Sequence, residues 1–133
     1  MGKAILCIKP LSREALMTAC KDERVATVMV HGEIAEFDRH VHAVFSNAVE
    51  VSVAELAACF EDEKRWRTLI DFVGKAASAG RRIVMSSGAS DVEEIIPPQQ
   101  LALVAAALTS RKNSCQESVS STPLSILRDR LFE

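Results

Sequence analysis

Four short apolar segments alternate with stretches of helical periodicity along the chain, and this alternation restricts the fold more than any other feature. The segments are residues 3–8, 25–30, 48–53 and 83–85. Their length suits strands that are buried in a sheet. Strands that alternate with helices form parallel sheets with right-handed crossovers. We therefore expect an α/β fold of four parallel β/α units, in a single domain over residues 1–133.

Five segments have the periodicity or the boundary residues of helices: residues 12–21, 35–45, 61–79, 101–108 and 124–132. Ser12 predicts the N-cap of the first helix, and prolines at positions 97 and 98 precede the fourth. Thr122 predicts the N-cap of the last helix, with Pro123 at its first position. Residues 110–121 are polar, and we expect a loop or a short helix there.

The expected helix over residues 61–79 has an apolar face and a charged face. The apolar face contains Trp66, Leu69, Ile70, Val73 and Ala77. The opposite face contains Lys64, Arg67, Asp71 and Lys75. The apolar stripe should pack on the sheet, so most of the basic side chains of this helix should point outward.

The pattern leaves the closure of the sheet open. Four parallel strands can form an open layer covered by helices, or half of a (β/α)8 barrel, which as a whole needs about 250 residues. Periodicity does not distinguish these two architectures.

Composition indicates a soluble protein of the cytoplasm. No apolar run approaches the roughly 20 residues of a membrane span, and the N-terminus lacks the layout of a signal peptide. Four cysteines, Cys7, Cys20, Cys59 and Cys115, are widely spaced and include no CxxC pair. We therefore expect reduced and mostly buried thiols, with neither a zinc site nor a disulfide framework.

Charge is distributed unevenly along the chain. The net charge of −2 argues against a protein that coats nucleic acid. Residues 1–63 hold 6 basic and 11 acidic side chains, residues 64–82 hold 6 and 1, and the remainder holds 4 and 6. A local basic band suits docking on phosphates at one place, and it also suits a solvated helix face.

Several short elements together carry a family resemblance. Residues 86–89 read Ser-Ser-Gly-Ala at the end of the last strand, and a proline and a Leu-rich helix follow. Further elements are Asp-Glu-Arg-Val at 22–25, Phe-Asp-Arg at 37–39, the strand at 48–52 with a Leu-containing loop at 53–56, and the segments 119–123 and 126–128. In this order they resemble component 3 of archaeal ribonuclease P, the counterpart of the thirty-kilodalton subunit of eukaryotic ribonuclease P and MRP.

The resemblance implies a fold and an assembly. Members of this family have a barrel related to the PHP phosphoesterases, and this chain corresponds to the second, C-terminal half of that barrel. We expect either a fragment or a compact form that completes itself by pairing with a second copy. A half barrel leaves sheet edges unpaired, which favours such a homodimer.

The resemblance also implies a function. The RNA subunit of ribonuclease P cleaves precursor tRNA with Mg²⁺, and component 3, paired with the small ferredoxin-like component 2, supports the catalytic RNA. The chain is thus expected to be a non-catalytic subunit in the 5′ maturation of precursor tRNA. It should hold no metal or catalytic residue of its own, and it should contact RNA through phosphates and shape.

Eleven residues are candidates for RNA contact: Arg39, Arg65, Arg67, Lys75, Arg81, Arg82, Ser86, Ser87, Gly88, Arg111 and Lys112. Arg39 and residues 86–88 match family elements, and the others are basic residues expected near strand ends or beside the long helix. Ser86, Ser87 and Gly88 offer hydroxyl or backbone N–H donors to a phosphate. They also suit a tight turn whose hydroxyls are satisfied locally.

Two other classes of function remain open. A PHP-like metal-dependent phosphoesterase would need clustered ligands. The chain has His31, His40 and His42, and the last two fall in an expected helix, where side chains at i and i+2 point apart. A protein–protein assembly module without RNA contact would need an exposed apolar surface, to which Phe60, Phe72 and the pair at 131–132 are expected to contribute.

Overall fold

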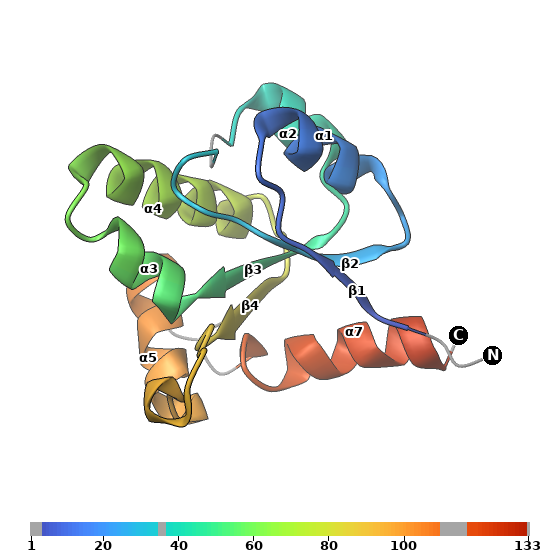
Figure 1. Ribbon diagram of the computed structural model, residues 1–133. Coiled ribbons are helices and arrows are strands. Elements are labelled where there is room, and N and C mark those ends of the chain that lie inside the picture. The colour runs from blue at the N-terminus through green and yellow to red at the C-terminus, as the bar shows by residue number, and fades with distance from the viewer. Residues whose placement is uncertain (1–3, 35–36, 110–116, 133) are drawn as a thin grey trace.

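The sheet has four parallel strands in the order in which they occur along the chain. The computed structural model describes residues 4–34, 37–109 and 117–132. The strands are β1 (Leu6–Ile8), β2 (Val25–Met29), β3 (Ala48–Ser52) and β4 (Ile83–Ser86), each paired with the next (Figure 1). The predicted α/β fold with alternating helices is confirmed.

Most of the helices occur where the sequence predicts them. They are α1 (Arg13–Lys21), α2 (Arg39–Val44), α3 (Val53–Cys59), α4 (Glu63–Ser78), η1 (Val92–Glu94), α5 (Pro98–Thr109) and α7 (Ser121–Leu131). Ser12 caps α1 as predicted, since its Oγ accepts a hydrogen bond from the Ala15 N–H at 3.1 Å. In the described part of the chain, no helix is long and apolar enough to cross a membrane.

Several helix starts differ from the prediction, and α5 begins at Pro98, three residues before the expected start. Helix α2 begins at Arg39 because Asp38 is its N-cap, and its carboxylate accepts from the N–H groups of His40 and Val41. Helix α7 begins at Ser121, so Thr122 and Pro123 lie inside its first turn, where proline leaves no intrahelical hydrogen bond unmade.

Helix α3 corrects the expected loop at residues 53–56. Its N-cap is Ser52, the last residue of β3, whose Oγ accepts from the Glu55 N–H at 3.1 Å. The Glu55 carboxylate does not return to the cap. It accepts from the Gly32 N–H at 3.0 Å and from the Cys59 thiol at 3.2 Å, and it thereby ties α3 to the chain after β2.

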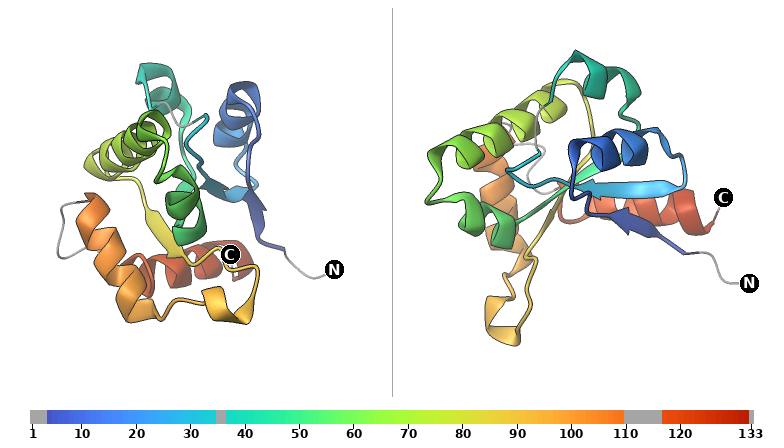
Figure 2. Two further views of the ribbon diagram at one scale, coloured as in Figure 1. Left: turned by 60° about the vertical axis from the view of Figure 1, so that its left-hand side comes forward. Right: turned by 45° about the horizontal axis from the view of Figure 1, so that its top comes forward.

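Helices α1, α2 and α4 cover one face of the sheet, and the main core lies between them and the strands (Figure 2). Phe72 of α4 is fully buried there, with its ring 5.1 Å from Phe37 and 6.2 Å from Phe45. The expectation that Phe72 contributes to an exposed apolar surface is therefore wrong. The buried face of α4 is shifted from the predicted stripe: Phe72 and Ala76 are buried together with Leu69, Val73 and Ala77, whereas Trp66 and Ile70 are only half-buried.

Helix α7 packs against the opposite face of the sheet (Figures 1 and 2). Ile126 is buried there against Ala26 and Ala48, with Ile5 and Val84 beside them. Ala26 and Ala48 lie at or near the amino ends of their strands. Helix α7 therefore covers the amino half of this second face, which we call the inner face.

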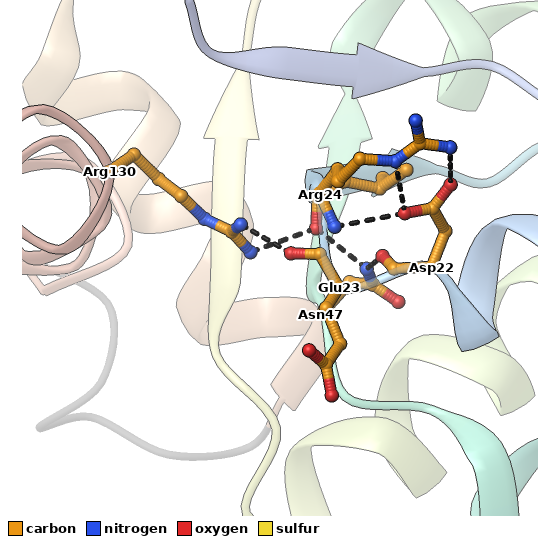
Figure 3. A network of polar contacts seen from close by, with 6 residues as sticks. Asp22, Glu23, Arg24, Asn47 and Arg130 are labelled. Atoms are coloured by element: carbon orange, nitrogen blue, oxygen red, sulfur yellow. Dashed lines mark hydrogen bonds and ion pairs between the residues drawn. The ribbon is translucent and has the colours of Figure 1, made fainter. Parts of the chain in front are cut away.

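Arg130 fastens α7 to the beginning of β2 (Figure 3). Its guanidinium donates to the carbonyl oxygen of Glu23, and also to that of Val25 at 3.1 Å. Asn47 donates to the same Val25 oxygen at 2.7 Å. Beside them the side chain of Arg24 donates to the carboxylate of Asp22 and lowers the pKa of that carboxyl to about 2.

The carboxyl half of the inner face carries a carboxylate held by two hydroxyls. Thr27 of β2 donates to one oxygen of Glu50 at 3.1 Å, and Ser86 of β4 donates to the other at 3.0 Å. These bonds join three neighbouring strands through their side chains. Glu50 itself is half-buried.

The described cysteines are free thiols, as expected. Cys20 and Cys59 are buried, whereas Cys7 is exposed on β1 and Cys115 lies outside the described residues. Burial raises the pKa of Cys20 to about 12, and burial together with the bond to Glu55 raises the pKa of Cys59. Both buried thiols are therefore uncharged at neutral pH.

Candidate nucleic-acid interface

The predicted RNA-contact residues that the structure describes lie at two opposite edges of the sheet. Arg65 and Arg67 are in the first turns of α4, and residues 86–88 end β4, so these five lie on the side of the strands' carboxyl ends. Lys75, Arg81 and Arg82 are near the end of α4 or just after it, and they lie toward the amino ends. From Arg65 to Lys75 the helix rises roughly 15 Å. The basic band is therefore not one surface.

Both arginines at the carboxyl edge are paired with carboxylates. Arg65 lies 3.6 Å from Glu33, and Arg67 pairs with Glu63 one helical turn away. The Nε of Arg65 is buried and has no acceptor among the described residues. These pairs offset the charge of both arginines, while Lys64 beside them is exposed and makes no ion pair within the described residues.

The serine hydroxyls after β4 are used within the protein. Ser86 donates its hydroxyl hydrogen to Glu50, and the Ser87 Oγ accepts from the Ala89 N–H at 3.3 Å. The Ser87 carbonyl accepts from the Ala54 N–H at 3.0 Å, at the start of α3. These contacts match the alternative of a locally satisfied turn.

Gly88 is required by this turn on two counts. Its φ is +64°, a backbone conformation that residues other than glycine rarely adopt. A Cβ at this position would also lie 2.7 Å from the Ser52 Cβ. We expect Gly88→Ala to lower the free energy of unfolding by about 2–4 kcal/mol, as the sum of backbone strain and overpacking. Urea denaturation of the purified variant measures this.

Gly80 is the matched control for that experiment. It also has a positive φ, +78°, but a Cβ there would meet no atom within 4 Å. Gly80→Ala should cost only the strain, about 1 kcal/mol. Equal losses in the two variants would show that the contact with Ser52 does not constrain the turn.

Acidic side chains surround the carboxyl edge. Six exposed carboxylates follow β3 and β4: Glu61, Asp62, Glu63, Asp91, Glu93 and Glu94. Like charge repels a phosphate, and the effect extends about 8–10 Å at ordinary salt. The electrostatics of this edge therefore oppose an RNA backbone.

A groove between α2 and α4 collects basic residues from the other edge. It has a volume of about 540 Å³, and its walls include Arg39, His42, Lys75 and Ser78. Arg39 is exposed and makes no ion pair within the described residues. Lys75 pairs with Asp71 at 2.7 Å.

One wall of the groove also contains the carboxylate of Asp38, whose charge is already compensated. Arg13 pairs with this carboxylate. The pKa of Asp38 is lowered chiefly by the hydrogen bond from the Val41 N–H, with Arg13 contributing further. Asp38 is thus a stable anion that is occupied as a helix cap.

Arg81 and Arg82 continue the basic region past the end of α4. The Arg81 Nη2 donates to the carbonyl of His42 at 3.1 Å, which ties it to the groove. The Arg82 Nη1 donates to Asp129 at 3.0 Å and to Ser125 at 3.3 Å, both on α7. We call Arg39, Lys75, Arg81 and Arg82 the amino-edge basic surface.

Two further predicted residues, Arg111 and Lys112, lie outside the described residues. Nothing in the structure therefore places them at either edge. Among the residues that the sequence did not single out for RNA contact, His42, Gly74 and Ser78 line the groove with Arg39. Only the packing of α2 on α4 brings them there, so no local signal identifies them.

The histidines do not form a ligand cluster in the described part of the chain. His31 is buried, and its Nε2 lies 2.7 Å from the Pro10 carbonyl oxygen. His40 and His42 are exposed on α2. Within residues 4–34, 37–109 and 117–132, no group of three or more His, Cys, Asp or Glu side chains is arranged to hold a metal ion.

Comparison with known proteins adds no identification. A scan against protein-family models gives no match, and a search of the curated proteins gives none either. The function is therefore inferred from the residues and their geometry.

Proposed function

We propose that the chain is a non-catalytic, RNA-binding subunit of ribonuclease P that supports the 5′ maturation of precursor tRNA. The observation that carries the proposal is the amino-edge basic surface. In a protein of net charge −2, Arg39 and Arg81 have no carboxylate partner within the described residues. Cations of this kind attract a phosphate backbone without reading its bases.

The proposal assigns the chemistry and the partners to the rest of the complex. The RNA subunit would cleave the phosphodiester with Mg²⁺, and this chain would act beside the ferredoxin-like component 2. This chain would contact precursor tRNA as part of the complex. The family resemblance at residues 22–25, 37–39 and 86–89 supports these assignments.

The proposed half barrel raises the question of how the inner face is completed. Helix α7 occupies the amino half of that face, where Ile126 is buried and Arg130 binds two carbonyls. A second copy that closed a barrel would have to displace α7. We propose that α7 takes the place of a second half at this end, and that homodimers form by other surfaces. Sedimentation equilibrium tests whether a homodimer forms.

An assembly module is the second candidate, and one observation favours it. Helix α7 presents an apolar groove of about 740 Å³ to the outside, lined by Leu124, Leu127, Leu131 and Phe132, with Arg128 beside them. Phe132 is 81% exposed. Such a stripe suits a partner protein.

The salt dependence of RNA binding tests the proposal. Four cations on single-stranded phosphates should give a log–log slope of about −3 between affinity and salt concentration. Filter binding of the ribonuclease P RNA at 50–300 mM salt measures it, with and without component 2. Binding with a slope near zero, or none at low salt, would favour the assembly module.

A further inference from the structure

A cavity of about 210 Å³ lies beside the amino end of β4, next to the amino-edge basic surface. It is open on one side and is lined by residues from the end of α4, the end of α5 and the start of α7. At about 30 Å³ per water molecule it holds roughly seven waters. That is room for a phosphate group with part of its hydration shell.

Arg81 lines this cavity and has donors to spare. Its Nη2 donates to the His42 carbonyl, and its other guanidinium N–H groups make no hydrogen bond within the described residues. Its Nε is buried and has no hydrogen-bond partner among the described residues. An unpaired buried donor is costly, and this one would reach an acceptor in the cavity after a movement of the Arg81 side chain, because the Nε is closed to solvent.

Arg82, the residue after Arg81, and Thr122 of α7 also line the cavity. Asp129 and Ser125 occupy the Arg82 Nη1, while its Nε and Nη2 make no hydrogen bond within the described residues. The Thr122 hydroxyl likewise has no partner there. The guanidinium of Arg81 bonds α2 and that of Arg82 bonds α7, on opposite faces of the sheet, so the two residues border the cavity from different sides. Guanidinium and hydroxyl donors are the groups that bind phosphate oxygens.

One group in the wall opposes an anion. Glu117 is exposed and also lines the cavity. With Arg81 and Arg82 the formal charge of the lining is +2 −1 = +1. The Thr109 hydroxyl donates to the Ala105 carbonyl at 2.8 Å and so is not available as a donor.

We propose that this cavity binds a single phosphate group, through Arg81, Arg82 and Thr122. The group is either free phosphate or a phosphate of an RNA backbone. The second source rests on the proposed function, and the first does not. The site would fix one phosphate in place, unlike the exposed cations around it.

Titration calorimetry with inorganic phosphate tests the proposal, with chloride at equal ionic strength as the reference. Arg81→Lys keeps the charge but removes the Nε donor, and it should weaken phosphate binding about tenfold. Thr122→Val keeps the shape and should weaken binding about threefold to tenfold. Glu117→Gln removes the opposing charge and should tighten binding several-fold.

The control is Arg67→Gln, which removes a cation at the opposite edge and should leave phosphate binding unchanged. Circular dichroism of each variant verifies folding, and Glu117→Gln, at an exposed position, remains informative if Arg81→Lys unfolds. Phosphate binding no stronger than chloride binding overturns the proposal. The proposal is also overturned if folded Arg81→Lys protein and Glu117→Gln protein both bind phosphate as tightly as the unaltered chain.

A competition arm identifies the source of the phosphate. If phosphate binds and displaces RNA more strongly than chloride does, the cavity takes an RNA phosphate. If phosphate binds without displacing RNA, the cavity takes free phosphate and the RNA contacts are on the exposed surface. RNA binding without any phosphate binding overturns the cavity site alone, whereas phosphate binding without RNA binding overturns the proposed function alone.

Discussion

Replacing Phe72 with alanine is expected to lower the free energy of unfolding by about 3–5 kcal/mol. The side chain is fully buried, and its ring meets the edges or faces of Phe37 and Phe45. The loss combines the transfer of the ring to water with the cavity left between α4 and the sheet. Since domains of this size are stable by about 5–15 kcal/mol, urea denaturation should show a much earlier midpoint.

Phe60→Ala is the control for the same experiment. Phe60 is 73% exposed and has one ring contact, with Trp66 at 5.7 Å. Its loss should be less than about 1.5 kcal/mol. If Phe72→Ala were as mild as Phe60→Ala, the packing of α4 on the sheet would be wrong.

The second large effect concerns RNA affinity. The double variant Arg39→Glu with Lys75→Glu reverses two exposed cations of the amino-edge basic surface. Two lost phosphate contacts and two added repulsions should weaken binding of the ribonuclease P RNA about 10–100-fold at 50 mM salt. The log–log slope should become shallower by about 1.4, and filter binding measures both quantities.

A matched variant separates a specific surface from overall charge. Lys64→Glu with Arg67→Glu reverses two exposed cations at the carboxyl edge and, like the first pair, changes the net charge from −2 to −6. Each pair also contains one cation that is paired within α4, Lys75 or Arg67. The second variant should keep most of the affinity, and equal losses would mean that net charge alone governs binding.

The strands and most helices are predictable because their signals are local. Each strand is an apolar run, and caps such as Ser12 and Asp62 have side chains suited to their role. Helix α3 also had a local signal, since Ser52 and Glu55 match the spacing of a capping box. The alternating run into Val53 concealed it, because strand and helix compete for that residue.

The inner face is not predictable from the sequence. The residues around Ile126 do not indicate which face of the sheet it covers. Nor does the sequence indicate that Arg130 binds backbone carbonyls more than 100 residues away. These contacts depend on the direction in which the chain returns after α5. The Ser86 hydroxyl is equally ambiguous in the sequence, because its acceptor Glu50 lies on another strand.

The candidate interface was predictable in composition but not in arrangement. The basic band of residues 64–82 is visible in the sequence, yet α4 extends from one edge of the sheet toward the other and separates its members. Only the packing of α2 on α4 brings Arg39 beside Lys75. Charge counts therefore identify the residues, and the topology identifies which of them share a surface.

The most direct test of the proposed function is reconstitution of precursor-tRNA cleavage. The ribonuclease P RNA is assayed at low Mg²⁺ with and without this chain and component 2. We predict that the unaltered chain stimulates cleavage. The double variant Arg39→Glu with Lys75→Glu should abolish this stimulation, and the double variant Lys64→Glu with Arg67→Glu should retain it. No stimulation by folded, partner-bound protein would contradict the account, and cleavage without any RNA subunit would instead indicate an enzyme.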